Sequence, residues 1–148
     1  DREIYTPQMI VNGMTHVLGS DRNAIERAMI STRRTAATLS VPLAVAVSDG
    51  KLNVKVPAAG EERAEVWLCP VAKAVPVTIG RGENNGRTIT YHNVVRRWVK
   101  LGEWNGQPRK FSKPVAEINA AGEVDSFAVV VQGGKPDTPG NIYGLGLR

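Results

Sequence analysis

The sequence predicts an α+β chain in which a small ββα unit is followed by an antiparallel β-sandwich domain. Asn12-Gly13 separates two short apolar runs, and an amphipathic stretch of helical period follows the second run. From Leu43 to Val56, apolar and polar residues alternate on both sides of a turn. Further short apolar runs recur at intervals of about 8–12 residues, a spacing typical of sandwiches. We therefore assign residues 1–34 to the first unit, 35–40 to a linker and 41–148 to the β domain.

The first unit is predicted to be a hairpin followed by one helix. Asn12-Gly13 joins a strand over 9–11 to a strand over 14–17, because both residues accept the positive φ that a tight turn needs. Ser20 or Asp21 can cap the helix by accepting hydrogen bonds from its free N–H groups. A two-stranded hairpin with one helix is too small to be stable alone. The unit therefore needs more sheet or a partner.

The β domain is predicted to contain seven or eight short strands. The alternation over 43–47 and 52–56 predicts a hairpin that turns at Ser48-Asp49-Gly50. Pro76 indicates that its strand has no partner on the side of the missing N–H group. A change of phase near His92-Asn93 predicts a bend or bulge in the long stretch 87–101. Strands are also expected over 65–69, 75–79, 109–115 and 126–132, a loop over 133–140, and a closing segment over 141–147.

The composition favours neither a nucleic-acid-binding protein nor a membrane protein. The net charge is +5, but the basic residues are spread along the chain and aromatic residues make up only 5%. Nucleic-acid-binding surfaces concentrate basic residues and interleave aromatic ones. No apolar run approaches the ~20 residues that span a bilayer. The chain begins without methionine and shows no signal peptide, which we interpret as a processed or truncated product.

The single cysteine and the two histidines carry no evident chemistry. Cys69 has no second thiol to pair with, and on a predicted strand beside Trp67 and Leu68 we expect it to be a small buried residue. His16 and His92 each lack another His, Cys or carboxylate at the spacing of a metal site. We therefore expect no metal and no cofactor.

Two stretches of the chain resemble one bacterial family. The first is Ile4–Arg27, which holds Thr6-Pro7 and the Asn12-Gly13 turn, and the second is Ile79–Trp104, which begins with a glycine-rich loop. Together they cover about a third of the chain, in the right order and spacing. The family is the thioredoxin-like group catalogued as domain of unknown function 1223, which is exported in many bacteria.

This resemblance implies that residues 1–34 are the C-terminal part of a thioredoxin-like domain, ahead of the β sandwich. It implies a cis Thr6–Pro7 bond in a loop where Tyr5, Thr6 and Pro7 contact substrate. It also implies a preceding half with a Cys-x-x-Cys motif; because that half is absent, we do not expect these residues alone to be redox-active. The missing half, or another chain, is the expected partner at the exposed sheet edge, and the expected location is periplasmic or secreted.

The Gly80–Arg87 loop is the first candidate binding site. Arg81 and Arg87 can hold a carboxylate or phosphate through paired hydrogen bonds, with Glu83 and Asn84 beside them. The alternative is an ordinary turn in which Asn84 and the glycines adopt positive φ and Glu83 pairs with an arginine. Strands flank the loop, and it lacks the Lys-Ser/Thr pair of a phosphate-binding P-loop.

Tyr91-His92-Asn93 is the second candidate, because a strand bend near the loop can gather polar groups. Asn93 can equally satisfy backbone groups at the irregularity. Three interpretations stay open: a fragment of an exported thioredoxin-like protein, a free-standing β-sandwich module that contacts an anionic ligand or a protein through the Arg81–Arg87 loop, and a hydrolase that uses His92. The hydrolase lacks a convincing nucleophile.

Overall fold

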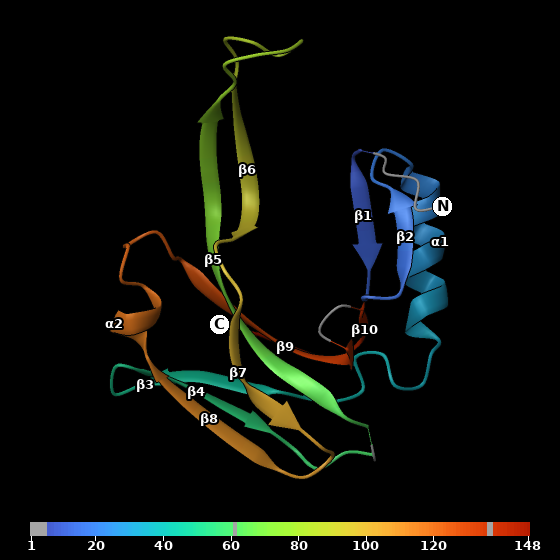
Figure 1. Ribbon diagram of the computed structural model, residues 1–148, viewed down its shortest axis with the longest axis vertical. Coiled ribbons are helices and arrows are strands. Elements are labelled where there is room, and N and C mark those ends of the chain that lie inside the picture. The colour runs from blue at the N-terminus through green and yellow to red at the C-terminus, as the bar shows by residue number, and fades with distance from the viewer. Residues whose placement is uncertain (1–5, 61, 136–137) are drawn as a thin grey trace.

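The structure is a computed structural model that describes residues 6–60, 62–135 and 138–148, and antiparallel strands dominate it (Figure 1). The elements in chain order are β1 (Gln8–Val11), β2 (Thr15–Leu18), α1 (Arg22–Arg33), β3 (Ala44–Ser48), β4 (Lys51–Val56), β5 (Ala64–Thr78), β6 (Thr88–Val95), β7 (Val99–Trp104), β8 (Arg109–Pro114), α2 (Val115–Ile118), β9 (Ser126–Lys135) and β10 (Thr138–Leu147).

The β1–β2–α1 unit forms as the sequence predicts. β1 and β2 pair in antiparallel register around Asn12 and Gly13, which adopt φ values of 51° and 72°. The Asp21 carboxylate accepts a hydrogen bond of 2.9 Å from the Ala24 N–H group and so caps α1. The Thr6–Pro7 peptide bond is cis, and the Pro7 carbonyl accepts a hydrogen bond of 2.7 Å from Gly19.

The strands after residue 40 form two sheets. One has five strands in the order β10-β9-β5-β6, with β7 also paired to β5, and the other has the order β3-β4-β8. The hairpin predicted over 43–56 is confirmed as β3 and β4, which turn at Asp49-Gly50. The core lies between the two sheets and contains Leu52 and Val54 from one sheet and Val66 and Leu68 from the other.

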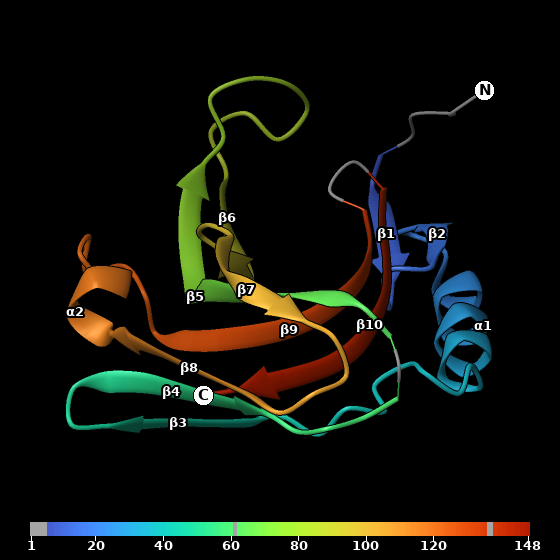
Figure 2. The same ribbon diagram turned by 60° about the horizontal axis from the view of Figure 1, so that its bottom comes forward.

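The expected fold class is wrong. The described part of the chain is mostly antiparallel β, with 53% of the described residues in strands and 11% in helices, and the larger sheet curls into a half-barrel (Figure 2). It is not the expected thioredoxin-like ββα unit followed by an antiparallel β-sandwich. Leu39 and Val41 donate backbone hydrogen bonds to Ile142 and Tyr143 of β10, which joins the larger sheet to the segment that leads into β3. Twist accumulates along strands as long as β5 and β9, so the sheet curls.

The two strands predicted over 65–69 and 75–79 are one strand. β5 runs unbroken for 15 residues and pairs with β7 and β9 in its first half and with β6 in its second. Pro76 is tolerated because the second half has β6 as its only partner and Pro76 lies beyond the last β9 pair at Val71. Two separate strands were predicted over 65–69 and 75–79, and long-range pairing makes them one.

Two further expectations at the C-terminal end are wrong. Residues 133–140 were expected to form a loop, yet β9 continues to Lys135 and β10 already begins at Thr138. The short helix α2 follows Pro114 directly and was not predicted. The strand predicted over 109–115 is confirmed as β8, which ends one residue earlier at Pro114, and the strand predicted over 126–132 is confirmed as most of β9.

The turn of the β1–β2 hairpin docks on β10. The Asn12 carbonyl accepts a hydrogen bond of 3.1 Å from Ile142, and the Thr38 hydroxyl donates one of 2.9 Å to the Asn141 side chain. Gly13 lies so close to the Gly140 carbonyl that a Cβ atom at Gly13 would overlap it. These contacts hold the β1–β2–α1 unit against one end of the half-barrel.

Candidate binding face

One face of the five-stranded sheet is apolar and largely uncovered. Side chains alternate along a strand, so Val66 and Leu68 of β5 enter the core while Trp67, Val75 and Val77 point to the opposite side. Strand pairing brings residues of β6 and β10 to that same side. We call this surface the open face; it comprises Trp67, Val75, Val77, Ile89, Tyr91, Val95, Trp98, Leu145 and Leu147.

The open face continues along an arm that leaves the body of the molecule. Beyond Val71, β5 pairs only with β6, and the two strands project as a ribbon (Figure 1). Val75 lies opposite Tyr91 and Val77 opposite Ile89, so all four share one side of the ribbon. The other side is polar and carries Thr78 and Thr88, whose hydroxyl groups are 3.3 Å apart. The arm is therefore amphipathic.

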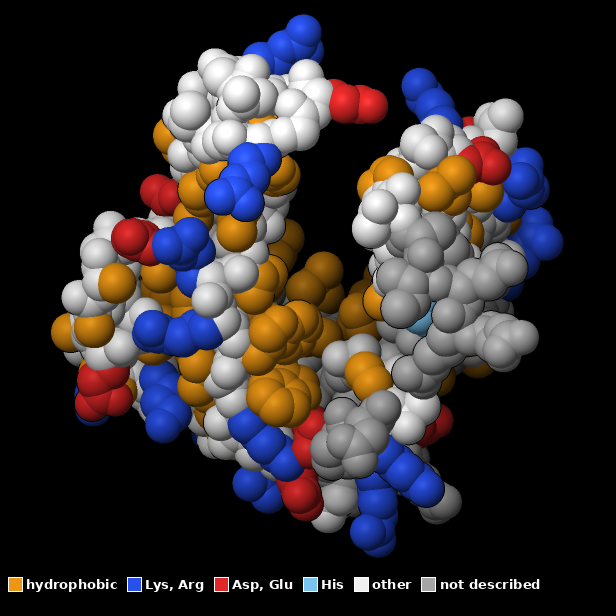
Figure 3. All heavy atoms as spheres, turned by 45° about the horizontal axis from the view of Figure 1, so that its top comes forward, with side chains coloured by type: hydrophobic (Ala, Val, Ile, Leu, Met, Phe, Trp, Pro, Cys, Tyr) orange, Lys and Arg blue, Asp and Glu red, His pale blue; other side chains and the backbone are white. Residues whose placement is uncertain are grey.

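The space-filling view shows a hollow between this arm and the β1–β2–α1 unit, with hydrophobic side chains gathered inside it (Figure 3). Six large apolar side chains of the open face are substantially exposed, among them Tyr91 at 49% and Trp98 at 56%. Contiguous exposed apolar surface of this kind is uncommon on soluble domains and marks interaction sites.

A pocket at the base of the open face lies beside two tryptophans. Its volume is about 200 Å³, and it is lined by Glu65, Trp67, Trp98, Gln132, Gly133, Gly134, Lys135 and Pro139. The two indole rings meet edge to face, with centroids 6.1 Å apart and planes at 82°. This pair was not predicted from the sequence. The available signal was Trp98 itself, a large aromatic residue within the predicted β-like stretch 87–101 in a chain with few aromatics.

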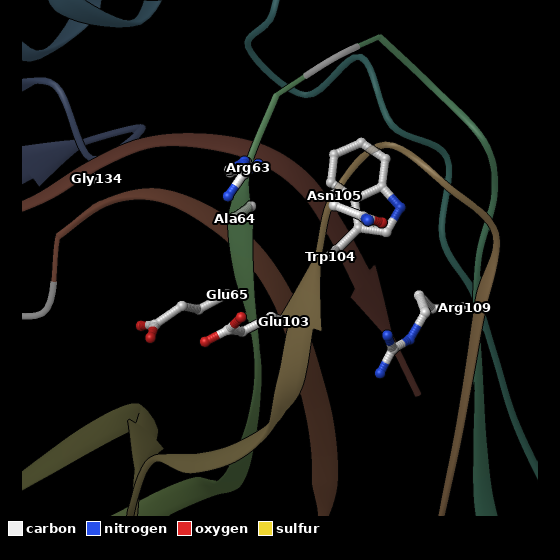
Figure 4. A pocket seen from close by; sticks show the side chains of 8 residues that line it. All are labelled: Arg63, Ala64, Glu65, Glu103, Trp104, Asn105, Arg109 and Gly134. Atoms are coloured by element: carbon white, nitrogen blue, oxygen red, sulfur yellow. The ribbon is translucent and has the colours of Figure 1, made fainter.

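A second, more polar cavity of about 350 Å³ lies near the end of β7 (Figure 4). Its two carboxylates, Glu65 and Glu103, are already paired within the chain. Lys100 forms ion pairs with Glu65 and Glu103, and the hydrogen bond with Glu65 raises the pKa of Lys100 above its usual value. Arg109 lies apart from these carboxylates with its guanidinium 5.5 Å from the centre of the Phe111 ring. The charged side chains of this cavity therefore do not converge on a common ligand position.

The Gly80–Arg87 loop forms the tip of the arm. Its backbone closes on itself, because Ile79 and Arg87 donate hydrogen bonds to Arg87 and Asn84 carbonyls, and Gly82 and Gly86 adopt positive φ. The Arg87 guanidinium is 3.4 Å from the Asn84 side-chain oxygen. Among the described ion pairs, none joins Glu83 to Arg81 or Arg87. All four candidate side chains, at 81, 83, 84 and 87, are exposed to solvent.

The second candidate group is divided between the two sides of the arm. Tyr91 lies on the open face opposite Val75, whereas His92 lies opposite Ala74 on the polar side. Asn93 has a φ of 53° and marks the irregularity that was predicted near this position. The structure thus brings Tyr91 together with the apolar residues of the open face and separates it from His92.

The remaining sequence candidates lie elsewhere. Thr6 and Pro7 are exposed at the entrance to β1, and Tyr5 lies outside the described residues. Cys69 is a free, buried cysteine in β5, as predicted, and burial raises the pKa of its thiol to about 11. His16 lies 3.1 Å from the Gln8 amide nitrogen.

Within residues 6–60, 62–135 and 138–148, no three His, Cys, Asp or Glu side chains converge as metal ligands. Neither described helix has the length and apolar composition needed to cross a bilayer.

Comparison with known proteins identifies the family of the chain and one similar solved structure. Residues 1–132 match the family described as "Protein of unknown function (DUF1223)". The chain belongs to this family. The crystal structure of a protein from Agrobacterium tumefaciens, a target of the Northeast Structural Genomics Consortium, is similar, with a TM-score of 0.81 and 25% sequence identity. That match covers 98% of this chain and 62% of the other, so the chain spans less than two thirds of its relative. No curated protein matches.

Proposed function

We propose that this DUF1223 chain acts as a polypeptide-binding module whose open face holds an apolar segment of a protein partner. The observation that carries the proposal is the continuity of the open face from Trp67 and Trp98 at its base to Val77 and Tyr91 on the arm. A two-stranded ribbon is marginally stable in water, and a bound segment would bury its apolar side.

The tip of the arm adds an electrostatic contribution to this proposal. Arg81 and Arg87 stand in solvent at the far end of the open face, and within the described ion pairs neither has a carboxylate partner. Exposed charges at the rim of an interface steer association and favour partners of opposite charge. We therefore expect the bound segment to combine apolar residues with one or more acidic residues.

The test uses a random peptide library displayed on phage and selected on the immobilised chain. Enriched peptides are synthesised, and their affinities for the wild type and for variants are measured by calorimetry. Tyr91→Ala removes an open-face ring and should weaken binding by about tenfold or more, because aromatic anchors dominate such interfaces. His92→Ala, on the polar side of the same strand, is the matched control and should change the affinity by less than about twofold.

Arg81→Ala combined with Arg87→Ala should weaken binding most at low salt and leave the melting temperature unchanged. Failure to enrich any peptide would overturn the proposal, and so would equal losses in the Tyr91 and His92 variants.

A second surface supports a partner at β1. Within the described residues, β1 pairs only with β2, and Met9 and Ile10 are 40% and 55% exposed. Met29 and Ile30 of α1 are also exposed. We propose that polypeptide from outside these 148 residues covers this edge, since unpaired strand edges readily add a strand. Hydrogen exchange of the outward β1 amides should be fast in this chain alone and much slower in a longer product of the source gene. Equal exchange rates would argue against it.

A further inference from the structure

The Trp67–Trp98 pair forms a corner rather than a flat platform. The two ring planes are nearly perpendicular, and Trp98 is 56% exposed while Trp67 is half-buried. A ligand group seated in the angle between the two planes therefore contacts both indole rings. Pro139 and the backbone of Gly133 and Gly134 complete the walls.

The size of the pocket decides between a small molecule and a side chain of a polypeptide. Its volume of about 200 Å³ lies below the roughly 300–1,000 Å³ of typical small-molecule sites. Gly133 and Gly134 carry no side chains, so this wall of the pocket is backbone. The pocket fits one or two compact apolar groups of a longer ligand.

The pocket lining includes two indole N–H donors and one ammonium donor, besides the Glu65 carboxylate and the Gln132 amide, whose Nε2 group donates to the Gly140 carbonyl at 3.0 Å. In the described part of the chain, neither the Trp67 nor the Trp98 Nε1–H group donates a hydrogen bond, whereas Trp104 uses its own to reach the Pro57 carbonyl at 3.2 Å. Lys135 adds an ammonium group at the rim. The Glu65 carboxylate is engaged by Lys100. The two indole N–H groups and the Lys135 ammonium group thus favour a ligand that offers hydrogen-bond acceptors at the corner.

We infer that the Trp67–Trp98 corner receives a proline of a polyproline II segment, an inference that rests on the proposed polypeptide-binding function. A polyproline II backbone makes no internal hydrogen bonds, so its carbonyl groups are free to accept from the indole N–H groups. Proline contributes a compact apolar ring and has no N–H group that would need an acceptor. Aromatic-lined grooves recognise such segments with little loss of entropy, because the conformation is preformed.

Two synthetic peptides test the inference. One is a twelve-residue peptide of repeated Pro-Pro-Leu with a single Glu, and the other replaces every proline by alanine. Affinities are measured by calorimetry, and contact with the corner is followed by tryptophan emission. The proline peptide should bind about tenfold or more tightly than its alanine counterpart. Trp98→Phe keeps an aromatic ring but removes the N–H donor, and it should weaken binding of the proline peptide severalfold. Trp98→Ala should abolish that binding.

The melting temperature and the emission of the buried Trp104 monitor folding of each variant. The controls separate this inference from the function on which it rests. If both peptides bind equally well and both are weakened by Tyr91→Ala, the open face binds polypeptides and the preference for proline is overturned. If Trp98→Phe binds the proline peptide as the wild type does, the hydrogen-bonding role of the corner is overturned. If neither these peptides nor any library peptide binds, both proposals fall.

Discussion

The two halves of β5 belong to one strand but differ in their pairing partners and in their burial. From Glu65 to Leu68 the strand pairs with β7 on one side and β9 on the other, and Val66 and Leu68 are completely buried. From Lys73 to Thr78 it pairs with β6 alone and is largely exposed. The covered half stabilises the fold, and the uncovered half presents a surface. Both halves contain valines and other apolar residues, so whether a residue belongs to the core or to the open face depends on which strands cover it and not on its type.

The strongest test of this contrast is a pair of truncations, one in each half. Leu68→Ala should lower the free energy of unfolding by about 2–5 kcal/mol, because Leu68 is fully buried in the core and a cavity remains. Val77→Ala, at a site that is 38% exposed in the arm, should cost less than about 1 kcal/mol. Chemical denaturation followed by tryptophan emission measures both values. Equal losses would show that the arm is as integral to the fold as the body.

A second test compares a covered turn with an uncovered one. Gly13 and Gly50 both occupy hairpin turns, with φ of 72° and 70°. Gly13 is docked against Gly140, whereas a Cβ atom at Gly50 would have no other atom within 4 Å. Alanine costs about 1–2 kcal/mol at either position for its left-handed backbone. Gly13→Ala adds overlap with the Gly140 carbonyl and should cost about 1 kcal/mol more than Gly50→Ala. Thermal melts of the two variants give the difference; identical melts would show that the turn does not dock.

Local elements were predictable because their determinants are local. Asn12-Gly13 specifies its turn, Asp21 caps α1, and the alternation from Leu43 to Val56 gives β3 and β4. The fold class was not predictable in this way. Whether β5 is one strand or two depends on β6, β7 and β9, which lie far away in the sequence. The curl of the sheet follows from that long-range pairing.

The candidate site was only partly predictable for the same reason. The Arg81–Arg87 loop was recognised as a loop between strands, but its place at the tip of an arm depends on how far β5 and β6 extend beyond the body. Tyr91 and His92 are neighbours in sequence and lie on opposite sides of the arm. Trp67 and Trp98 meet only after β5, β6 and β7 have paired. The exported location and the partner at β1 stay predictions.

The smallest expected effect concerns Cys69, which lies in the covered half of β5. Burial raises the pKa of its thiol from 9.0 to about 11, so the folded chain keeps the thiol neutral while an unfolded chain ionises it at the lower value. Stability that depends on the neutral thiol is complete below pH 9 and is lost as the pH rises toward 11. By pH 10 the wild type should lose about 1 kcal/mol that Cys69→Ala does not lose. Denaturation curves of both proteins at pH 8 and pH 10 measure the difference, and the variant corrects for lysines and tyrosines that titrate in the same range. If the stabilities of the two proteins change equally with pH, the Cys69 thiol is exposed to water like the side chains of the arm, and the buried part of β5 does not include it.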